Sequence, residues 1–374
     1  MATVFKTFLN NDIKSTRTLL HEAIPVTGTI VSATYGAHPD EANVKNYAHG
    51  MFQSVYDYPY LSSSANAIFD LTVGYSTASA LSAAEGTAGY VQQAKKINLY
   101  NEMAGVLMGY DADGSVILFD ADGDLAGTTS DKLNEVIFVN FSRLLQKDEI
   151  KKGSFSMKLG AESTYRDACS SLLTITDDNA QNNYRTNAAA GDYGILSCSA
   201  GGAYSGSAGQ DLFGKAGLLF YQAGVAVLTC SIFQGIPSGS LLEDAAWLTG
   251  QASTAKHAPF TSLSGALTGT SISGVCDGFR HRIDDITFNN TTELNSTIHF
   301  CRINSSDYNY SSNPTYLSAS KMKVKNSQLD APVSYFTTVG LYSADNELLA
   351  VAKLSEPMKK DPTNEMIIRV RLDY

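Results

Sequence analysis

One stretch of the chain comes close to the phosphate-binding loop of nucleotide-binding proteins. The segment Gly209-Gln-Asp-Leu-Phe-Gly-Lys-Ala216 matches the spacing G-x-x-x-x-G-K, but Ala216 stands where the loop needs a hydroxyl to bind Mg²⁺. The loop works only where a buried strand delivers it to a helix N-terminus, and a Ser/Gly-rich stretch precedes Gly209. We therefore interpret the segment as an ordinary glycine turn and expect no nucleotide or other cofactor.

A series of aspartates across two turns could hold a cation, because carboxylate oxygens are good calcium ligands. They are Asp111, Asp113, Asp120, Asp122 and Asp124. An EF-hand loop that began at Asp120 would need Gly at its sixth position and Glu at its twelfth, where this chain has Leu125 and Asp131. The Asp-Gly pairs at 113–114 and 122–123 are instead typical of tight hairpin turns. The sequence thus predicts turns and no metal site, with structural calcium as the alternative.

The remaining polar residues give no catalytic arrangement. His21-Glu22 lacks the second histidine of the zinc-protease motif, and no serine or cysteine lies in a nucleophile motif. The other histidines, which show no ligand spacing, are His38, His49, His257, His281 and His299. Around His281 lie Arg280, Arg282, Asp284 and Asp285, which we interpret as surface or interface ion pairs. We predict no catalytic residue, and hence that the chain is not an enzyme.

Composition favours a protein that is covered by other proteins. Charged residues make up 17% of the 374 residues, against about 25% in typical soluble domains. The chain has 20 Tyr and 16 Phe, and the centres of protein interfaces are likewise poor in charge and rich in aromatic side chains. A β-rich extracellular protein would have a similar composition. The net charge of −10, with only short basic stretches at 321–325 and 359–360, predicts no binding of nucleic acid.

The cysteines and the apolar stretches suggest a chain made in the cytoplasm. The five cysteines contain no Cys-x-x-Cys and are interpreted as buried free thiols: Cys169, Cys198, Cys230, Cys276 and Cys301. No signal peptide is expected from the first residues. The segment 217–233 is close to the length of about 20 residues that spans a bilayer. Its Gln222, Thr229 and β-branched residues favour two buried strands around 223–224, so we expect no membrane insertion.

The elements that would position these residues alternate between helix and strand. A helix is expected over 12–22, capped by Asp12 and stopped by Pro25, and a longer one over 92–108, where apolar residues recur every three or four positions. The runs 67–75 and 135–141 are typical of strands, the first buried on both sides. The polar stretches 177–187 and 198–209 bury little, so we expect them to order only on assembly, and 241–248 is a short helix candidate.

These elements predict a mainly β, α+β fold with antiparallel, sandwich-like sheets and long loops. Four segments are expected. They are 1–65, an N-terminal helix plus an extended segment; 66–173, an α+β domain; 174–270, a loop-rich insertion or second domain; and 271–374, a C-terminal β domain.

The C-terminal segment carries a β-hairpin signal. Strands are predicted over 335–342 and 347–354, joined across Asp345-Asn346. A last strand over 367–374 places Ile368, Val370 and Leu372 on one face and its charged residues on the other. Candidate assembly residues are the apolar positions of the hairpin and the tyrosines of the preceding loop: Val339, Leu341, Tyr342, Leu349, Val351, Tyr308, Tyr310 and Tyr316.

Stretches 307–316, 334–342, 346–357 and 367–374 together resemble a module near the ends of virion structural proteins of contractile-tailed phages of marine bacteria. The core V-G-L-Y-x-x-x-N-E-L-L-A-V-A, residues 339–352, is also similar to a segment of tail-fibre and tail-collar proteins that attach to a baseplate. In this chain Asn346-Glu347 replaces the usual glycine-containing turn. Residues 51–65 and 141–155 resemble structural proteins of the same phages.

The resemblance implies a structural protein of the virion, assembled in the host cytoplasm and located in the tail, baseplate or fibre-attachment region. Its partners would be further copies of itself and other virion proteins. Two alternatives stay open. One is a capsid decoration or neck protein, and the other is a receptor- or glycan-binding module in which Tyr308, Tyr310 and Tyr316 contact the host surface.

Overall fold

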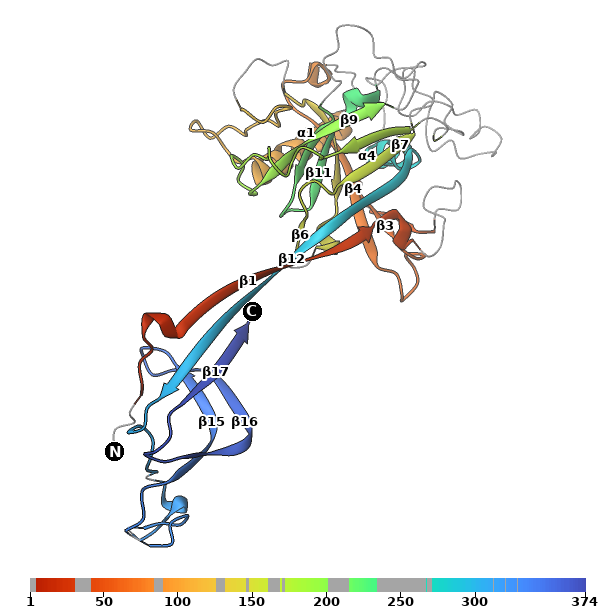
Figure 1. Ribbon diagram of the computed structural model, residues 1–374. Helices are drawn as coiled ribbons and strands as arrows, with labels where there is room; N and C mark the ends of the chain where they lie inside the picture. Colours follow the sequence, from red (N-terminus) through yellow and green to blue (C-terminus); the bar gives the residue numbers. More distant parts are fainter. Residues whose placement is uncertain are drawn as a thin grey trace. The chain divides into compact units, whose positions relative to one another are not determined.

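The computed structural model shows two compact units (Figure 1). Unit 1 comprises residues 1–20 and 293–374, and unit 2 comprises residues 21–292. The structure describes residues 5–30, 42–83, 90–125, 132–145, 148–160, 169, 172–200, 215–233, 267, 271–311, 313–319, 321–327 and 329–374. Unit 1 therefore contains both the start and the end of the chain, which the sequence predicted to lie in different segments.

Most of the described residues with regular structure are strands, so the predicted mainly β, α+β class is confirmed. The helices are α1 (Tyr90–Leu107) and α4 (Ile272–Arg280), with short 3-10 turns at Asn10–Asp12, Thr27–Thr29, Ala80–Ala83, Ser142–Leu144, Cys230–Phe233 and Pro314–Tyr316. Among the described residues, no helix is long and apolar enough to cross a membrane.

Unit 2 is built on one large sheet. Its strands are β2 (Val44–Asn46), β3 (Gln53–Tyr56), β4 (Ala67–Tyr75), β5 (Glu135–Asn140), β6 (Glu149–Ile150), β7 (Ser156–Gly160), β8 (Leu172–Thr176), β9 (Tyr193–Ala200), β10 (Gly217–Phe220) and β11 (Val225–Thr229). Two longer strands, β1 (Ile13–Pro25) and β12 (Ile283–Ile303), contribute residues to both units. The order is β1-β12-β7-β8-β9-β10-β11-β5-β4-β3-β2, and β6 also pairs with β12.

The central strands of this sheet are buried on both faces. Along β5, Val136 and Phe138 belong to one apolar core, and Ile137 and Val139 belong to a second core on the other side. The first core includes the inner face of α1, and the second includes α4. Because side chains alternate along a strand, an uninterrupted apolar run is what a strand between two cores requires.

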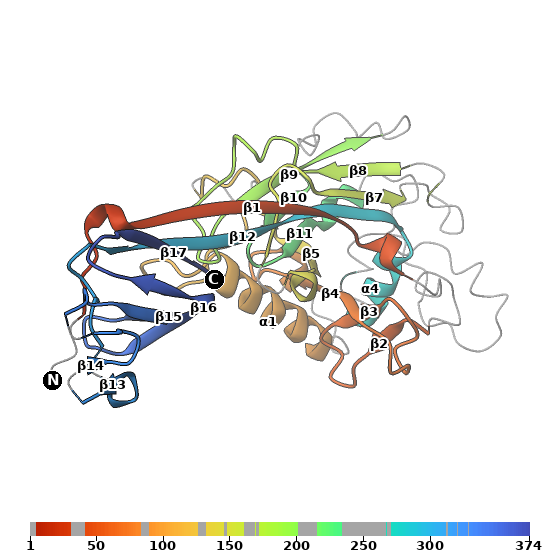
Figure 2. The same ribbon diagram turned by 60° about the horizontal axis from the view of Figure 1, so that its bottom comes forward.

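Helix α1 lies directly against β4 (Figure 2). A Cβ at Gly74 of β4 would lie 2.8 Å from the backbone oxygen of Lys96 and 2.9 Å from the nitrogen of Tyr100. Gly109, at φ 97°, ends the helix, and its N–H donates to the Ala104 carbonyl. This is the left-handed residue that commonly closes a helix. The helix and strands predicted over 92–108, 67–75 and 135–141 are therefore confirmed.

The structure also bears on the predictions for two further segments of unit 2, 217–229 and 177–187. Residues 217–229 form the antiparallel pair β10–β11 around 223–224, as predicted. The stretch 177–187 does not lack buried groups, because Asp177 and Ala180 are buried. The Asp177 carboxylate accepts hydrogen bonds from the N–H groups of Gly153 and Phe155, both 2.8 Å, so the stretch is anchored at its start. Residues 178–179 and 181–184 are exposed, and ordering on assembly stays a prediction. Residues 201–209 and the helix candidate 241–248 lie outside the described residues.

Unit 1 contains β13 (Leu317–Ser318), β14 (Lys321–Met322), β15 (Ser334–Tyr342), β16 (Leu348–Lys360) and β17 (Met366–Asp373), together with its parts of β1 and β12. β17 pairs antiparallel with residues 296–303 of β12, and β15 pairs with β16. The last residue, Tyr374, exchanges two backbone hydrogen bonds with Asn295. The predicted hairpin and the closing strand are confirmed, and Val370 is buried while Arg369 and Arg371 are exposed.

The helix expected over 12–22 is wrong, because these residues belong to strand β1. All eight residues of β1 in unit 1 are exposed, so the segment has no apolar stripe that a helix could bury. In unit 1, Arg17 pairs with Glu293 of β12. In unit 2, the Glu22 N–H donates to the Asn290 side chain at 2.9 Å. Pairing with a strand far away in sequence thus outweighs the local capping signal.

Candidate functional site

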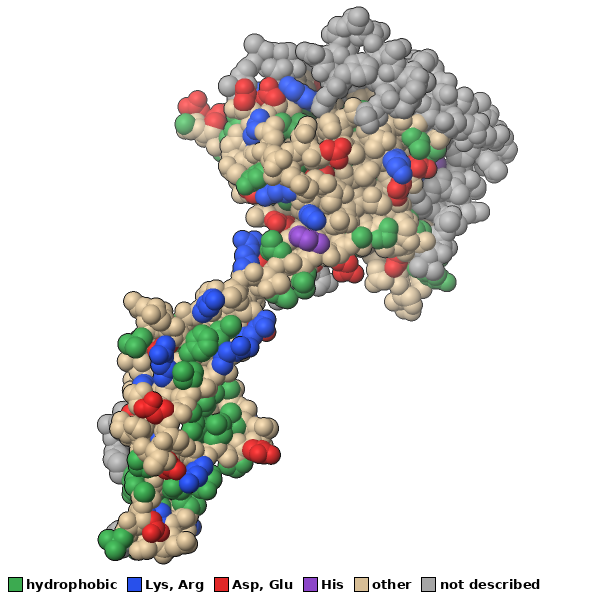
Figure 3. Space-filling model, viewed as in Figure 1, with side chains coloured by type: hydrophobic (Ala, Val, Ile, Leu, Met, Phe, Trp, Pro, Cys, Tyr) green, Lys and Arg blue, Asp and Glu red, His purple; other side chains and the backbone are tan. Residues whose placement is uncertain are grey.

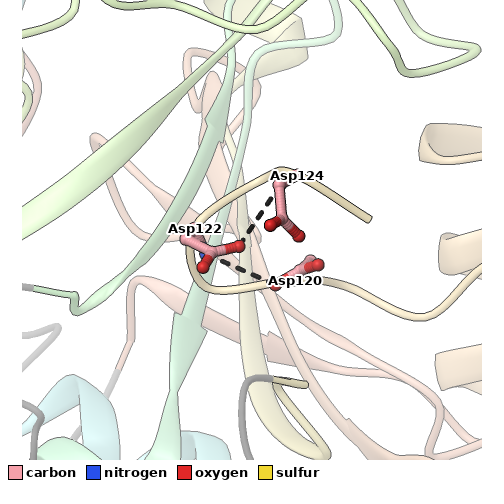
Figure 4. Close-up of side chains that lie close together, drawn as sticks. All are labelled: Asp120, Asp122 and Asp124. Atoms are coloured by element: carbon pink, nitrogen blue, oxygen red, sulfur yellow. Dashed lines mark hydrogen bonds between the residues drawn. The ribbon is translucent and has the colours of Figure 1, made fainter. Parts of the chain in front are cut away.

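Hydrogen bonds within the turn and two lysines surround the acidic cluster at 120–124. Asp120, Asp122 and Asp124 offer carboxylate oxygens within 4.8 Å of one another (Figure 4). The N–H groups of Asp122 and Asp124 donate to the preceding carboxylates at 3.4 and 3.3 Å, as in aspartate turns. The Lys132 ammonium lies 2.7 Å from the buried Asp120, and Lys215 lies 3.5 Å from Asp122. The two lysines thus place positive charge beside two of the three carboxylates.

The charged residues around His281 are only in part the surface pairs that the sequence predicts: Asp285 forms a partly exposed pair with Lys158 at 3.5 Å, whereas the two arginines do not lie at the surface. Arg280 and Arg282 are fully buried in unit 2. Arg280 pairs with Asp277 at 2.8 Å and donates to the Gln53 side chain at 3.1 Å, while Arg282 donates to the Gly160 carbonyl at 2.9 Å. A buried guanidinium needs such partners, since its desolvation is costly. The surface interpretation is wrong for both arginines, which tie α4 to the sheet.

The phosphate-loop-like segment and the cysteines give no functional site either. Of the segment resembling a phosphate loop, Lys215 and Ala216 are described, and Ala216 is buried beside β9. Burial of the cysteines is confirmed for Cys230 and Cys276 and is wrong for Cys169, which is exposed. His38 and His257 lie outside the described residues. The polar residues named above do not come together in a catalytic arrangement in the described part of the chain.

The candidate assembly residues of the C-terminal hairpin lie on two opposite faces. In the register of β15 and β16, Val339 is paired with Ala352 and Leu341 with Ala350, whereas Val351 is paired with Gly340. Paired residues of an antiparallel ladder point to the same side. Leu341 is 7% exposed, and Leu349 and Val351 are 67% and 51% exposed. The apolar positions of the hairpin therefore form an inner face and an outer face.

The inner face of the hairpin borders a groove of about 610 Å³ within unit 1. Twenty residues line it, and they come from the N-terminal segment, β12, β15, β17 and two loops. Its aromatic side chains are those of Phe5, Phe8, Phe300, Tyr308, Phe336 and Tyr342. The rings of Phe5 and Tyr342 lie 4.8 Å apart, and the Phe8 ring lies 5.4 Å from that of His299. A concave, mainly apolar site of this size can take a small ligand or several side chains of a protein partner.

Charged groups at this groove already have partners. Asp12 pairs with Arg302, and Lys6 pairs with Asp307. A hydrogen bond from the Leu9 N–H, together with the Arg302 guanidinium, lowers the pKa of Asp12. The Lys6 ammonium, followed by the Asn304 N–H, lowers the pKa of Asp307. Because these charges are matched in pairs, the site favours an apolar occupant over a charged one.

A buried lysine organises the tyrosine loop beside the groove. Lys360, at the end of β16, is fully buried, and its ammonium donates to the carbonyls of Ser305 and Asp361 and to the Asn309 side chain, at 2.8–3.0 Å. Tyr308, which is 49% exposed, adopts φ 54°, a left-handed conformation uncommon for a bulky residue. The loop is thus fixed to the hairpin by polar contacts.

The three tyrosines of the glycan-binding alternative do not share one position. Tyr308 lines the groove and Tyr310 is 56% exposed. The Tyr316 hydroxyl accepts a hydrogen bond from the Tyr335 N–H at 2.8 Å, so it anchors β15. Only the first two present aromatic surface in the manner that sugar stacking requires.

The outer face of the hairpin carries an apolar patch, formed by Tyr342, Leu348, Leu349 and Val351 around Gly340. All four side chains are at least 44% exposed. In Figure 3, hydrophobic side chains gather over β15, β16 and β17. We call this set the outer patch. Tyr342 belongs to both the outer patch and the groove, so the two surfaces are continuous.

Part of this site was missed at the level of sequence. Phe5, Phe8, Phe300 and Phe336 lie at the groove, as does the ion pair Asp12–Arg302. These residues come from opposite ends of the chain, and no local spacing links them. Lys360 belongs to the short basic stretch 359–360. The sequence alone does not show which lysine of this pair is buried and donates to three acceptors.

No protein-family model, curated protein or solved structure matches this chain. Its class therefore follows from its own features: it is a mainly β protein of two units, of which unit 1 bears an apolar groove and an adjoining exposed patch.

Proposed function

We propose that the chain is a structural component of a phage virion, in the tail or baseplate or at a fibre-attachment point, and that it acts by assembly rather than catalysis. The observation that carries the proposal is the surface of unit 1. Among its described residues, three apolar side chains are buried, while 18 large ones are exposed. Of these, the outer patch and the adjoining groove form a continuous apolar surface, and such contiguous exposed surfaces mark interaction sites.

Other features support the same role. The C-terminal module, which resembles parts of virion proteins, is the β15–β17 region that carries the groove and the outer patch. The low share of charged residues suits a surface that other proteins cover. We infer that the partners are further copies of the chain and other virion proteins, that nucleic acid is not a partner, and that assembly takes place in the host cytoplasm.

The location of the chain in the particle distinguishes the proposed tail role from the alternative role in the head. We expect mass spectrometry of purified particles of the encoding phage, separated into tails and DNA-filled heads, to find the chain in the tail fraction. Recovery with the heads would favour the alternative of a capsid decoration or neck protein. Absence from the particles would contradict the whole proposal.

A receptor- or glycan-binding role is the second candidate, and the exposed Tyr308 and Tyr310 favour it. In that case the purified protein should bind host cells or a glycan array saturably. The double variant Tyr308→Ala/Tyr310→Ala should lose this binding, and Tyr58→Ala, at a tyrosine of unit 2 that is 41% exposed, should keep it. Binding that all these variants retain would exclude the tyrosine loop as the receptor site.

A further inference from the structure

The groove of unit 1 is far larger than the voids of a packed protein interior. Protein interiors are packed as closely as organic crystals, and their few voids seldom exceed a water molecule, which occupies about 30 Å³ in the liquid. The groove beside Val339 and Leu341 measures about 610 Å³, and only Met322, Leu341 and Val370 are buried among the described apolar residues of the unit. The inner face of the hairpin thus borders a space that a neighbouring molecule can occupy.

The outer patch has the size of a partial interface. Its four side chains each expose roughly half of their surface, or about 100 Å² apiece, so the patch offers about 400 Å². A standard interface buries about 800 Å² on each partner. The adjoining groove extends the apolar surface through Tyr342 towards that size.

The charges of the two units favour self-association through unit 1. Unit 1 contains 12 Lys and Arg and 10 Asp and Glu, a net charge of +2. Since the whole chain carries −10, unit 2 carries −12. Two copies that met through unit 2 would repel each other, whereas two copies of unit 1 meet almost without net charge.

We propose that unit 1 binds a second copy of this chain, with the outer patch of one copy seated in the groove of the other. The proposal rests on the structural role inferred above and names its partner and its surface. Unit 1 supplies both halves, because the groove is an open, mainly apolar space and the outer patch presents exposed apolar side chains that can fill it. Such a head-to-tail contact closes into a ring where the rotation allows it and otherwise extends into a row of subunits.

The test is the association state of the purified full-length chain, measured by sedimentation velocity from nanomolar to high micromolar concentration. Leu349→Lys and Val351→Lys place a charge in the outer patch. Ala344→Trp fills the groove from an exposed position in its lining. Each should raise the apparent Kd by about 100-fold or more, since a buried unpaired charge or a blocked groove removes the contact.

Leu329→Lys is the matched control, because Leu329 is an exposed leucine of the same unit, 96% exposed and not in the groove lining. It should leave the association unchanged. Hydrogen exchange of the amides of 348–353 should slow as the wild-type concentration rises, and circular dichroism should show each variant folded. Loss of association in the three variants, with Leu329→Lys unaffected, supports the proposal.

A wild-type chain that stays monomeric at all concentrations overturns the inference. So does an association that all four substitutions weaken alike, or one that none of them weakens. These outcomes can be distinguished from a failure of the proposed function. A chain found in particles but monomeric refutes only this interface, and a chain that self-associates through it but is absent from particles refutes only the virion role.

Discussion

The two units of this chain are stabilised in different ways. Among the described residues, unit 2 buries 49 apolar side chains and exposes six large ones, whereas unit 1 buries three and exposes 18. Unit 2 is held by burial on both faces of a sheet. Unit 1 depends on polar contacts, such as Asp12–Arg302 and the three hydrogen bonds of Lys360. The difference teaches that regular strands alone do not make an apolar core, and that a unit without one is suited to completion by a partner.

The largest expected effect lies in the core of unit 2. Phe138 is 1% exposed and its ring lies 5.7 Å from that of Phe119. Phe138→Ala should lower the free energy of unfolding by about 3–5 kcal/mol, because it removes buried surface and leaves a cavity. Denaturant unfolding followed by circular dichroism measures the change.

Truncation of an exposed residue of unit 1 is the comparison. Leu329→Ala should change the free energy of unfolding by less than about 0.5 kcal/mol. If Phe138→Ala cost no more than this control, the view that apolar burial stabilises unit 2 would be wrong.

A close contact between helix and sheet should give the next effect. Gly74→Val would press its side chain on the backbone of α1 at Lys96 and Tyr100, which a rotamer change cannot relieve. We expect a loss of about 1–3 kcal/mol in the free energy of unfolding. Ala78→Val, which adds the same type of bulk at an exposed position shortly after β4, should be nearly neutral in the same measurement. Equal effects of both substitutions would contradict the close packing at Gly74.

In unit 1 the corresponding test removes a polar contact. Lys360→Met leaves three acceptors without their donor and should cost about 1–3 kcal/mol. Hydrogen exchange should become faster in 304–311, the loop that Lys360 holds. Lys359→Met, at the exposed neighbouring lysine, should leave that loop protected. Fast exchange in both variants would show that the loop depends on overall charge and not on the buried ammonium.

The sequence predicted the elements whose cause is local. The apolar period of α1, the uninterrupted apolar run of β5 and the Asp345-Asn346 turn each determine structure within a few residues. Asn346 indeed adopts φ 64°, the left-handed conformation that asparagine tolerates in place of glycine. Asp345-Asn346 therefore makes this tight turn without a glycine.

The features that escaped prediction depend on distant partners. Residues 12–22 look helical when read alone, and their strand structure comes from β12, almost 300 positions away. Arg280 looks like a surface charge until Gln53 and Asp277 surround it. The groove combines Phe5 with Phe300 and Phe336, and no spacing rule could have linked them.

The smallest expected effect is a difference between the two units in their stability at acidic pH. In unit 1 the pKa of Asp361 is lowered to about 2 by hydrogen bonds from Thr363, and the pKa values of Asp12, Asp307 and Asp373 are lowered by hydrogen bonds and nearby cations. In unit 2, burial raises the pKa of Asp177, whereas the Asp124 N–H lowers that of Asp122.

The sign of the effect follows from these directions. A carboxyl group with a lowered pKa stabilises the folded state above its unfolded value of about 3.8, and this contribution is lost as the pH falls through the folded value. A raised pKa acts in reverse, because the folded state takes up the proton first. From neutral pH towards 4, unit 2 should gain slightly through Asp177 while unit 1 stays unchanged. Between about pH 4 and 2, unit 1 should lose stability first.

Oxidative footprinting at pH 7, 4 and 3 can measure this difference, with Tyr308 and Tyr342 reporting on unit 1 and Tyr100 and Tyr193 on unit 2. Labelling of the first pair should rise before that of the second, since the polar contacts of unit 1 include the carboxylates that acid protonates. Asp177→Asn should remove the gain of unit 2 near pH 4 and leave unit 1 unaffected. If unit 2 opened first, its charges would contribute more to its stability in acid than its apolar cores do. The contrast between a unit held by burial and one held by polar contacts would then be wrong.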